Sequence, residues 1–219
     1  MRTRVSRVLT TGVLVASICG CANIGGGVPG SGVSRTETRA VGAFEQVEVS
    51  ASARLIVTIG PAGPLQITGD DNLLPLVTTT VENGRLTIKP SEPIRPDVPL
   101  IIKVSTPALR NAAGHGATTL DLTGLTGEAF EVECSGASSV KAAGQVKSLA
   151  IRLSGASSAV LDALQAAEVA VAISGAGTAT VHATEKLSVD LSGASTVVYS
   201  GDPKVEKKLS GVCTVVKKK

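Results

Sequence analysis

Serine hydroxyls recur at regular spacing in the second half of the chain, and a serine can act as a nucleophile when a base stands beside it. The chain has only two histidines, His115 and His182, and neither lies in the nucleophile-elbow sequence Gly-x-Ser-x-Gly. We therefore expect the hydroxyls to satisfy backbone groups at sharp corners. His182 is expected to face solvent, whereas His115 stands between two glycines and is of greater functional interest. The Ser-Gly pairs begin at Ser135, Ser154, Ser174, Ser192 and Ser210.

Carboxylates are the other groups that could do chemistry, because glycoside hydrolysis needs two of them on one face. Asp70 and Asp71 form the only adjacent acidic pair, and we interpret them as a solvated turn after Gly69. Glu131 and Glu133 would protrude on one outward face, so they are the first residues to test if the protein acts on polysaccharides. We predict no catalytic residues.

The cysteines raise the questions of disulfides and metal binding. Cys134 and Cys213 lie four repeats apart, which places them about 19 Å from each other, beyond the limit of about 7 Å for a disulfide. We expect two free thiols: Cys134 as a small core hydrophobe and Cys213 in place of the second serine of a corner. Two histidines and two scattered cysteines show no zinc-ligand spacing, so neither a metal nor a cofactor is expected.

The N-terminal residues predict export. Three arginines precede the apolar stretch Val8–Ile18, which is typical of a secretion signal and is shorter than the roughly 20 residues that a membrane-spanning helix needs. The run Ile18-Cys19-Gly20-Cys21 resembles the bacterial lipobox, which implies cleavage before Cys21 and lipid on its thiol. Cys19 is the weaker candidate, because Ile18 would then precede the cleavage site. The alternative is an ordinary secretory signal that leaves a soluble protein with a free terminal thiol.

We therefore divide the chain into a signal peptide at residues 1–20, a lipid anchor with a flexible Gly-rich tether at residues 21–42, and a folded body at residues 43–219. Loss of the signal removes three of 21 basic residues and leaves 18 against 18 acidic ones. The neutral mature charge argues against a nucleic-acid partner. Trp is absent, and the few aromatic residues disfavour a stacking platform for bases or sugars.

The spacing of the Ser-Gly pairs predicts the architecture. Successive pairs lie 19, 20, 18 and 18 residues apart, a period typical of stacked repeats in which neighbours complete one another's core. Before each pair, apolar residues recur at every second position, which predicts a strand. The fold class is therefore all-β, a parallel β-solenoid with coils of about 19 residues. Aligned strands give three inner columns, which are Phe130, Leu149, Val169, Leu187 and Val205; Val132, Ile151, Val171 and Val189; and Cys134, Leu153, Ile173, Leu191 and Leu209.

The ends of this repeat region are less regular. Lys207 breaks the second inner column in the last coil, as expected of a terminal cap. In the first half the solenoid should begin near Ala43, and Asn83-Gly84 between apolar strands predicts a two-residue hairpin. Four prolines between Pro90 and Pro99 predict an irregular loop or an edge, because proline has no N–H for a ladder. No long helix is expected.

Several runs together resemble the bacterial DUF2807 family, labelled the head GIN domain of putative autotransporter adhesins, over about residues 43–217. The resemblance implies a right-handed parallel β-solenoid in an exported or surface-attached protein. It suggests adhesion and carries no catalytic residues to transfer. The runs are Ala43-Phe44-Glu45-Gln46-Val47-Glu48-Val49-Ser50, Gly69-Asp70-Asp71-Asn72-Leu73-Leu74-Pro75, Gly84-Arg85-Leu86-Thr87-Ile88 and the repeated Ser-Gly-Ala-Ser.

Three functions remain open. The leading hypothesis is a non-enzymatic structural or adhesion module, displayed on a lipid anchor in the bacterial cell envelope, that binds an envelope or surface partner through the flank of the solenoid. We expect it on the outer membrane, facing either the periplasm or the surface. The competing hypothesis is a polysaccharide-active enzyme, because parallel β-helices also carry lyases and hydrolases. The third is an envelope scaffold or sensor with no ligand of its own.

Overall fold

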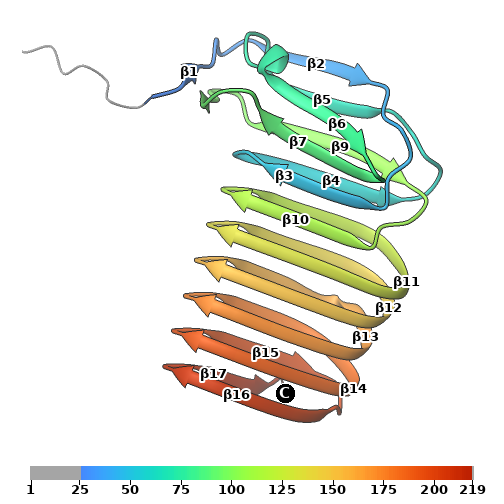
Figure 1. The fold of residues 1–219 in the computed structure, drawn as a ribbon, viewed down its shortest axis with the longest axis vertical. Helices are drawn as coiled ribbons and strands as arrows, with labels where there is room; N and C mark the ends of the chain where they lie inside the picture. Colours follow the sequence, from blue (N-terminus) through green and yellow to red (C-terminus); the bar gives the residue numbers. More distant parts are fainter. Residues whose placement is uncertain (1–25, 219) are drawn as a thin grey trace, which may run out of the picture.

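The computed structural model describes residues 26–218, so the predicted signal peptide and Cys21 lie outside the described residues. The described residues form an all-β solenoid whose coils stack from the N-terminal to the C-terminal end (Figure 1). The predicted fold class is confirmed. The only helix among these residues is the short 3-10 helix η1 (Leu74–Leu76), and none is long and apolar enough to span a membrane.

The regular part of the solenoid consists of long bent strands that pair in parallel with the coils before and after them. Between residues 111 and 217 there are about five turns of about 20 residues, close to the predicted 19. The strands are β1 (Val28–Pro29), β2 (Ser34–Arg39), β3 (Gln46–Ser50), β4 (Ala53–Ile59), β5 (Leu65–Asp70), β6 (Val77–Glu82), β7 (Arg85–Pro90), β8 (Ile94–Arg95), β9 (Leu100–Thr106), β10 (Asn111–Gly116), β11 (Thr119–Gly136), β12 (Ser139–Gly155), β13 (Ser158–Gly175), β14 (Thr178–Gly193), β15 (Thr196–Ser200), β16 (Lys204–Gly211) and β17 (Thr214–Lys217).

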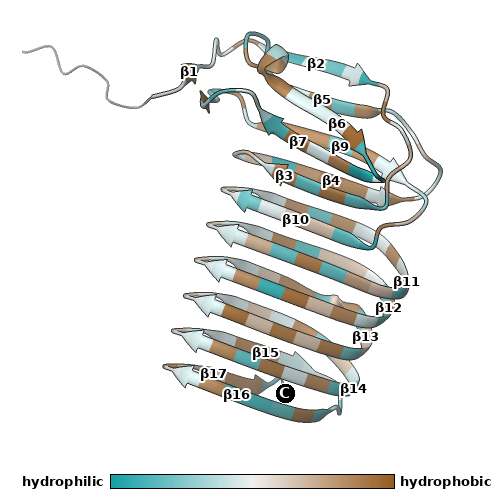
Figure 2. Ribbon diagram, viewed as in Figure 1, coloured by the Kyte–Doolittle hydropathy of each residue, from teal (hydrophilic) through white to brown (hydrophobic). Residues whose placement is uncertain are grey.

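The core lies inside the coils, where the predicted inner columns stack in register. Phe130 is opposite Leu149 and Leu153 is opposite Ile173, and these side chains are at most 3% exposed. Figure 2 shows apolar and polar residues alternating along the coil strands. A period of two sends one side chain inward and the next outward, and the neighbouring coil covers the inward one from above and below. The predicted columns are therefore confirmed as the core as far as β14, whereas in the last described coil Val205 is only partly buried and Leu209 is 46% exposed.

A glycine with positive φ turns each coil at its Ser-Gly corner. Gly155 has a φ of +72°, and a Cβ atom there would stand 2.6 Å from the carbonyl oxygen of Gly136 on the preceding coil. Only glycine avoids both the strained dihedral and the clash. Close stacking of the backbone at these corners explains why the glycine of the Ser-Gly pair repeats.

Most of the corner hydroxyl bonds come from a different serine than predicted, although Ser192 Oγ donates to Ile173 O at 3.4 Å as expected of a serine before the glycine. Ser157 Oγ donates to Ser154 O at 2.8 Å, and the buried Ser138 makes the same bond to Ser135 O at 2.8 Å. The serine before the glycine was expected to do this. That assignment is wrong for Ser154, because it follows the inward Leu153 in a period of two and its side chain is therefore exposed on the outside.

The N-terminal part continues the coils with additional hairpins. β3 pairs with β10 and β7, while β4 pairs with β11 and β9, so the solenoid extends through this region. The antiparallel hairpin of β6 and β7 turns at Asn83 and Gly84, whose φ angles are +51° and +74°. The predicted two-residue turn is confirmed. In the proline-rich segment, only β8 forms a strand, and it pairs with β1.

The residues expected to form a flexible tether are in part folded. β2 pairs antiparallel with β5 from Ser34 opposite Asp70 to Arg39 opposite Leu65. Arg39 also donates from Nη2 to Leu74 O at 2.8 Å. The tether predicted for residues 21–42 is therefore wrong for β1 and β2. The few apolar residues of this segment gave no sign of strands in the sequence. Backbone pairing along the edge of β5 holds β2 in place, so β2 needs no hydrophobic face of its own.

Candidate interaction face

One side of the solenoid presents straight columns of outward side chains, which we call the serine face. It comprises the outward residues of β3, β10 and β16 and of the later halves of β11 to β14, where the register aligns equivalent positions. Its three columns are Gln46, Asn111, Glu131, Ala150, Ala170, Ser188 and Glu206; Glu48, Ala113, Glu133, Arg152, Ala172, Asp190 and Lys208; and Ser50, His115, Ser135, Ser154, Ser174, Ser192 and Ser210.

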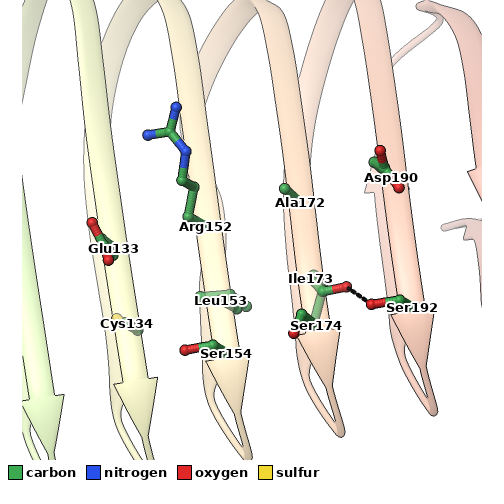
Figure 3. Close-up of a pocket in the computed structure, with 10 residues that line it drawn as sticks. All are labelled: Glu133, Cys134, Arg152, Leu153, Ser154, Ala172, Ile173, Ser174, Asp190 and Ser192. Atoms are coloured by element: carbon green, nitrogen blue, oxygen red, sulfur yellow. Dashed lines mark hydrogen bonds between the residues drawn. The ribbon is translucent and has the colours of Figure 1, made fainter.

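A shallow groove of about 360 Å³ crosses the serine face over β11 to β14. Ala172 lies at its floor, between Arg152 on the preceding coil and Asp190 on the following one (Figure 3). A second hollow of about 160 Å³ continues from it beside Ala170 and shares the same Arg and Asp. Successive coils are about 4.8 Å apart, so the two charged rims are separated by about 10 Å. That width suits one extended chain.

Positively and negatively charged side chains lie along this groove, together with serine hydroxyls. Arg152 forms an ion pair with Glu131, and Lys208 Nζ lies 3.2 Å from Asp190 Oδ2. Glu133 is exposed, and among the described residues it makes no ion pair. Exposed pairs contribute little to stability, about 0 to 1 kcal/mol each. The groove therefore presents carboxylates, a guanidinium and a row of serine hydroxyls to a partner. Breaking the exposed ion pairs to bind that partner would cost little free energy.

The thiols are not reactive groups of this site. Cys134 is fully buried beneath the groove, and burial, with a smaller contribution from the charge of Glu133, raises the pKa of its thiol to about 12. Cys213 is partly buried, with its Sγ 3.4 Å from Ser210 O. It occupies the position of the second corner serine, as predicted. Both cysteines are free.

His115 meets a serine and a carboxylate from the coils on either side. Its Nδ1 lies 2.8 Å from Ser135 Oγ, and its Nε2 lies 4.0 Å from Glu48 Oε1. Glu48 in turn accepts a hydrogen bond from Arg85 Nη1 at 3.1 Å. The expectation that no base stands beside a corner serine is therefore wrong for Ser135. Residues 20 apart became neighbours because that distance is one coil.

This cluster lacks the geometry of an activated nucleophile. The carboxylate is too far from His115 for a hydrogen bond, and Glu48 is already engaged by Arg85. At the same corner, the Ala137 N–H donates to Gly116 O at 2.8 Å and so is not free for an oxyanion. His182 lies on the opposite side of the solenoid in the early part of β14 and is partly exposed. We assign the His115 cluster a structural role, as part of the third column of the serine face.

Asp70 is buried and holds three segments together, so the predicted solvated turn is wrong for this residue. Its carboxylate accepts hydrogen bonds from the backbone N–H groups of Gly32 at 2.8 Å and of Asp97 and Val98 at 3.0 Å each. Burial acts to raise the pKa of Asp70, but these hydrogen bonds outweigh it and hold the pKa below its ordinary value of 3.8. Both carboxylate oxygens of Asp70 bind N–H groups of this chain's own backbone, so the role of Asp70 is structural.

The groove was not predicted from the sequence, although two outward carboxylates close to it were. Glu131 and Glu133 do face outward as predicted: Glu133 lines the groove on one side, and Glu131 pairs with Arg152 next to it. The hollow arises because Ala172 is short where the adjacent coils carry Arg152 and Asp190, and it continues beside Ala170, whose neighbours Ala150 and Ser188 are short as well. Two alanines at successive outward positions of one coil were the signal that could have located it.

The described residues thus form a parallel β-solenoid, a stacked-repeat architecture whose side presents an extended surface. Within this architecture the family is shown by sequence. The chain belongs to the DUF2807 family, described as putative auto-transporter adhesin, head GIN domain, which it matches over residues 43–203.

Solved structures share this fold at low sequence identity. A putative adhesin from Bacteroides fragilis is 22% identical, with a TM-score of 0.68, over 87% of this chain and 100% of its own. A putative adhesin from Parabacteroides merdae (18%, TM-score 0.56) and a putative lipid binding protein from Parabacteroides distasonis (20%, TM-score 0.54) each cover 88% of this chain and 99% of their own. These likenesses establish the fold alone. No curated protein sequence matches the chain.

Proposed function

We propose that this protein is a non-enzymatic adhesion module of the bacterial cell envelope, held by lipid on Cys21, that binds a surface or envelope partner through the serine face. The observation that carries the proposal is the groove between Arg152 and Asp190. It is open and shallow, and it is lined by groups that form hydrogen bonds and ion pairs. Membership of a family described as adhesins supports the same function.

The chain geometry supports a membrane-proximal arrangement. β1 begins at Val28, seven residues after Cys21, and an extended chain gains at most about 3.5 Å per residue. Val28 would then lie within about 25 Å of the lipid. The N-terminal end of the solenoid would face the membrane, and the C-terminal coil would lie at the far end (Figure 1). The serine face along the side stays open to a partner.

A photo-crosslinking experiment tests the proposed binding face. Benzoylphenylalanine replaces Ala172 in the groove, and a matched variant carries it at Thr178, which is exposed on the opposite side of the solenoid. Irradiation of cells that display the protein should give a higher-mass adduct from position 172 and little from position 178. Benzophenone inserts into C–H bonds, so it captures proteins and polysaccharides alike. Equal adducts from both positions, or none, would favour a scaffold or sensor without a ligand on this face.

A further inference from the structure

The last coil leaves the edge of the solenoid unpaired. β16 pairs with β14, and β17 pairs with β15. No described residue pairs with the other edge of either strand. An edge of this kind presents a row of backbone N–H and C=O groups to which a further extended segment can add. The family match ends at residue 203, so this coil lies beyond the matched part of the chain.

Apolar side chains along this edge are exposed where their counterparts one coil earlier are covered. Leu209 is 46% exposed, whereas Leu191 above it is fully buried. Val216 is 47% exposed on β17, and Val212 at the corner is 82% exposed. The apolar column therefore ends in a surface that another strand would cover.

Lys207 places a positive charge in the middle of that surface. Its backbone position is in register with the buried Val189, so it continues a column of inward apolar residues. Its charged neighbours on β16 are engaged: Glu206 pairs with Lys186 and Lys204, and Lys208 pairs with Asp190. Among the described residues Lys207 makes no ion pair. A strand that covered it would bury an uncompensated charge unless it brought an acid.

We propose that the edge of β16 is a docking site for an extended segment of a partner protein that carries an acidic residue between two apolar ones. Such a segment would add in parallel as the next coil, with its apolar residues over Val205 and Leu209 and its carboxylate over Lys207. The segment would then cover Val205 and Leu209 and at the same time form an ion pair with Lys207.

Charge argues against the other occupants. A second copy that paired antiparallel through its own β16, in the register centred on this column, would set Lys207 against Lys207, and like charges in direct opposition are destabilising. Residues 1–25 of this chain contain no acidic residue, so its own N-terminal segment does not supply the carboxylate. The occupant that matches the edge is therefore a partner segment with the pattern apolar-x-acidic-x-apolar.

Two peptides of equal charge test this. Both copy residues 204–217 with Cys213→Ser; one carries Lys207→Glu, which puts the acid on the inward side, and the control carries Lys208→Glu, which puts it on the outward side. The protein is the full chain with Cys21→Ser, which takes no lipid, and binding is followed by fluorescence anisotropy. The Lys207→Glu peptide should bind at least about tenfold more tightly than the control.

A charge reversal in the protein completes the test. With Lys207→Glu in the protein, the preference should invert in favour of a peptide that keeps Lys207. Lys207 is exposed, and unchanged melting by circular dichroism would show that the variant is folded. Equal affinity for the two acidic peptides, or no binding of either, would overturn the proposal. Self-association of the native protein in sedimentation, abolished by substitutions on β16, would overturn it in favour of a second copy.

Discussion

A single carboxylate determines how the N-terminal segment joins the solenoid. Asp70 accepts backbone hydrogen bonds from the loop before β2 and from the loop before β9. A buried carboxylate that several N–H groups satisfy is stabilised in its charged form. The folded state therefore favours ionised Asp70 more than the unfolded state does, which makes the stability of this end of the molecule depend on pH.

The first prediction concerns this pH dependence. Because the folded pKa of Asp70 lies below 3.8, its contribution is complete above that value and disappears as the pH falls through the lower folded pKa. Asp70→Asn should lower the melting temperature at pH 7, and the difference from the native protein should shrink in melts at progressively lower pH. Glu82→Gln, an exposed isosteric change, serves as control. A deficit for Asp70→Asn that is independent of pH would contradict the assignment.

The second prediction concerns the His115 cluster, where a hydroxyl and an imidazole are in hydrogen-bond contact. Since Glu48 is 4.0 Å from His115 and the nearby Ala137 N–H is already bonded, we expect no covalent reaction of Ser135 with a fluorophosphonate probe. Intact-protein mass spectrometry measures this, with an active serine hydrolase as positive control. Labelling that is lost in both Ser135→Ala and His115→Ala would instead identify a nucleophile.

At the scale of strands, the alternation of side chains decides which positions carry stability. β12 lies between two other coils, so its inward residues are covered on both sides while its outward residues meet water. The difference between adjacent positions is therefore large, although they are neighbours in sequence. β16 shows the consequence of a missing neighbour, since the same pattern there leaves Leu209 half exposed.

The third prediction tests this contrast with adjacent substitutions. Leu153→Asp, at a position 3% exposed, should unfold the repeat region, because an unpaired buried carboxylate costs several kcal/mol. Arg152→Ser should change the free energy of unfolding by no more than about 1 kcal/mol, since it removes an exposed ion pair. Thermal melts by circular dichroism compare the two. Similar losses in both variants would mean that inside and outside are assigned incorrectly.

At the scale of the whole molecule, the two ends of the solenoid differ. The N-terminal end is covered by β2 and the hairpin of β6 and β7, whereas the last coil that the structure describes, β16 and β17, has an unpaired edge (Figure 1). In the anchored protein that we propose, the closed end would face the membrane and the open end would point away from it. Both proposed binding surfaces, the serine face and the β16 edge, would then be accessible from outside the membrane.

The fourth prediction tests the anchor. Cys21→Ser should abolish lipidation and leave the protein unprocessed or released, because only a thiol takes the diacylglyceryl group. Metabolic labelling with a palmitate analogue, followed by fractionation of membranes, measures both effects. Cys19→Ser is the matched control and should label normally. Undiminished label on Cys21→Ser would show that the lipid is elsewhere.

The coils, their approximate period and the inner columns as far as β14 could be predicted from the sequence. Two properties made this possible: side chains alternate strictly along a strand, and contacts between coils recur at one nearly constant separation. Leu149 over Phe130 and Val169 over Leu149 follow the same rule, so aligning the repeats was equivalent to building the contacts. The glycine corners followed for the same reason.

Features that depend on irregular separations along the chain, or on the packing of several coils, could not be predicted in this way. Gly32 reaches Asp70 across 38 residues, and no repeat in the sequence relates the two. The groove depends on the relative lengths of side chains on three coils. The contact of His115 with Ser135, by contrast, spans one coil of 20 residues in regular register, so extending the repeat back to His115 could have predicted it. Local alternation specifies which side of a strand faces inward, whereas the packing of the completed coils specifies what the outward residues meet.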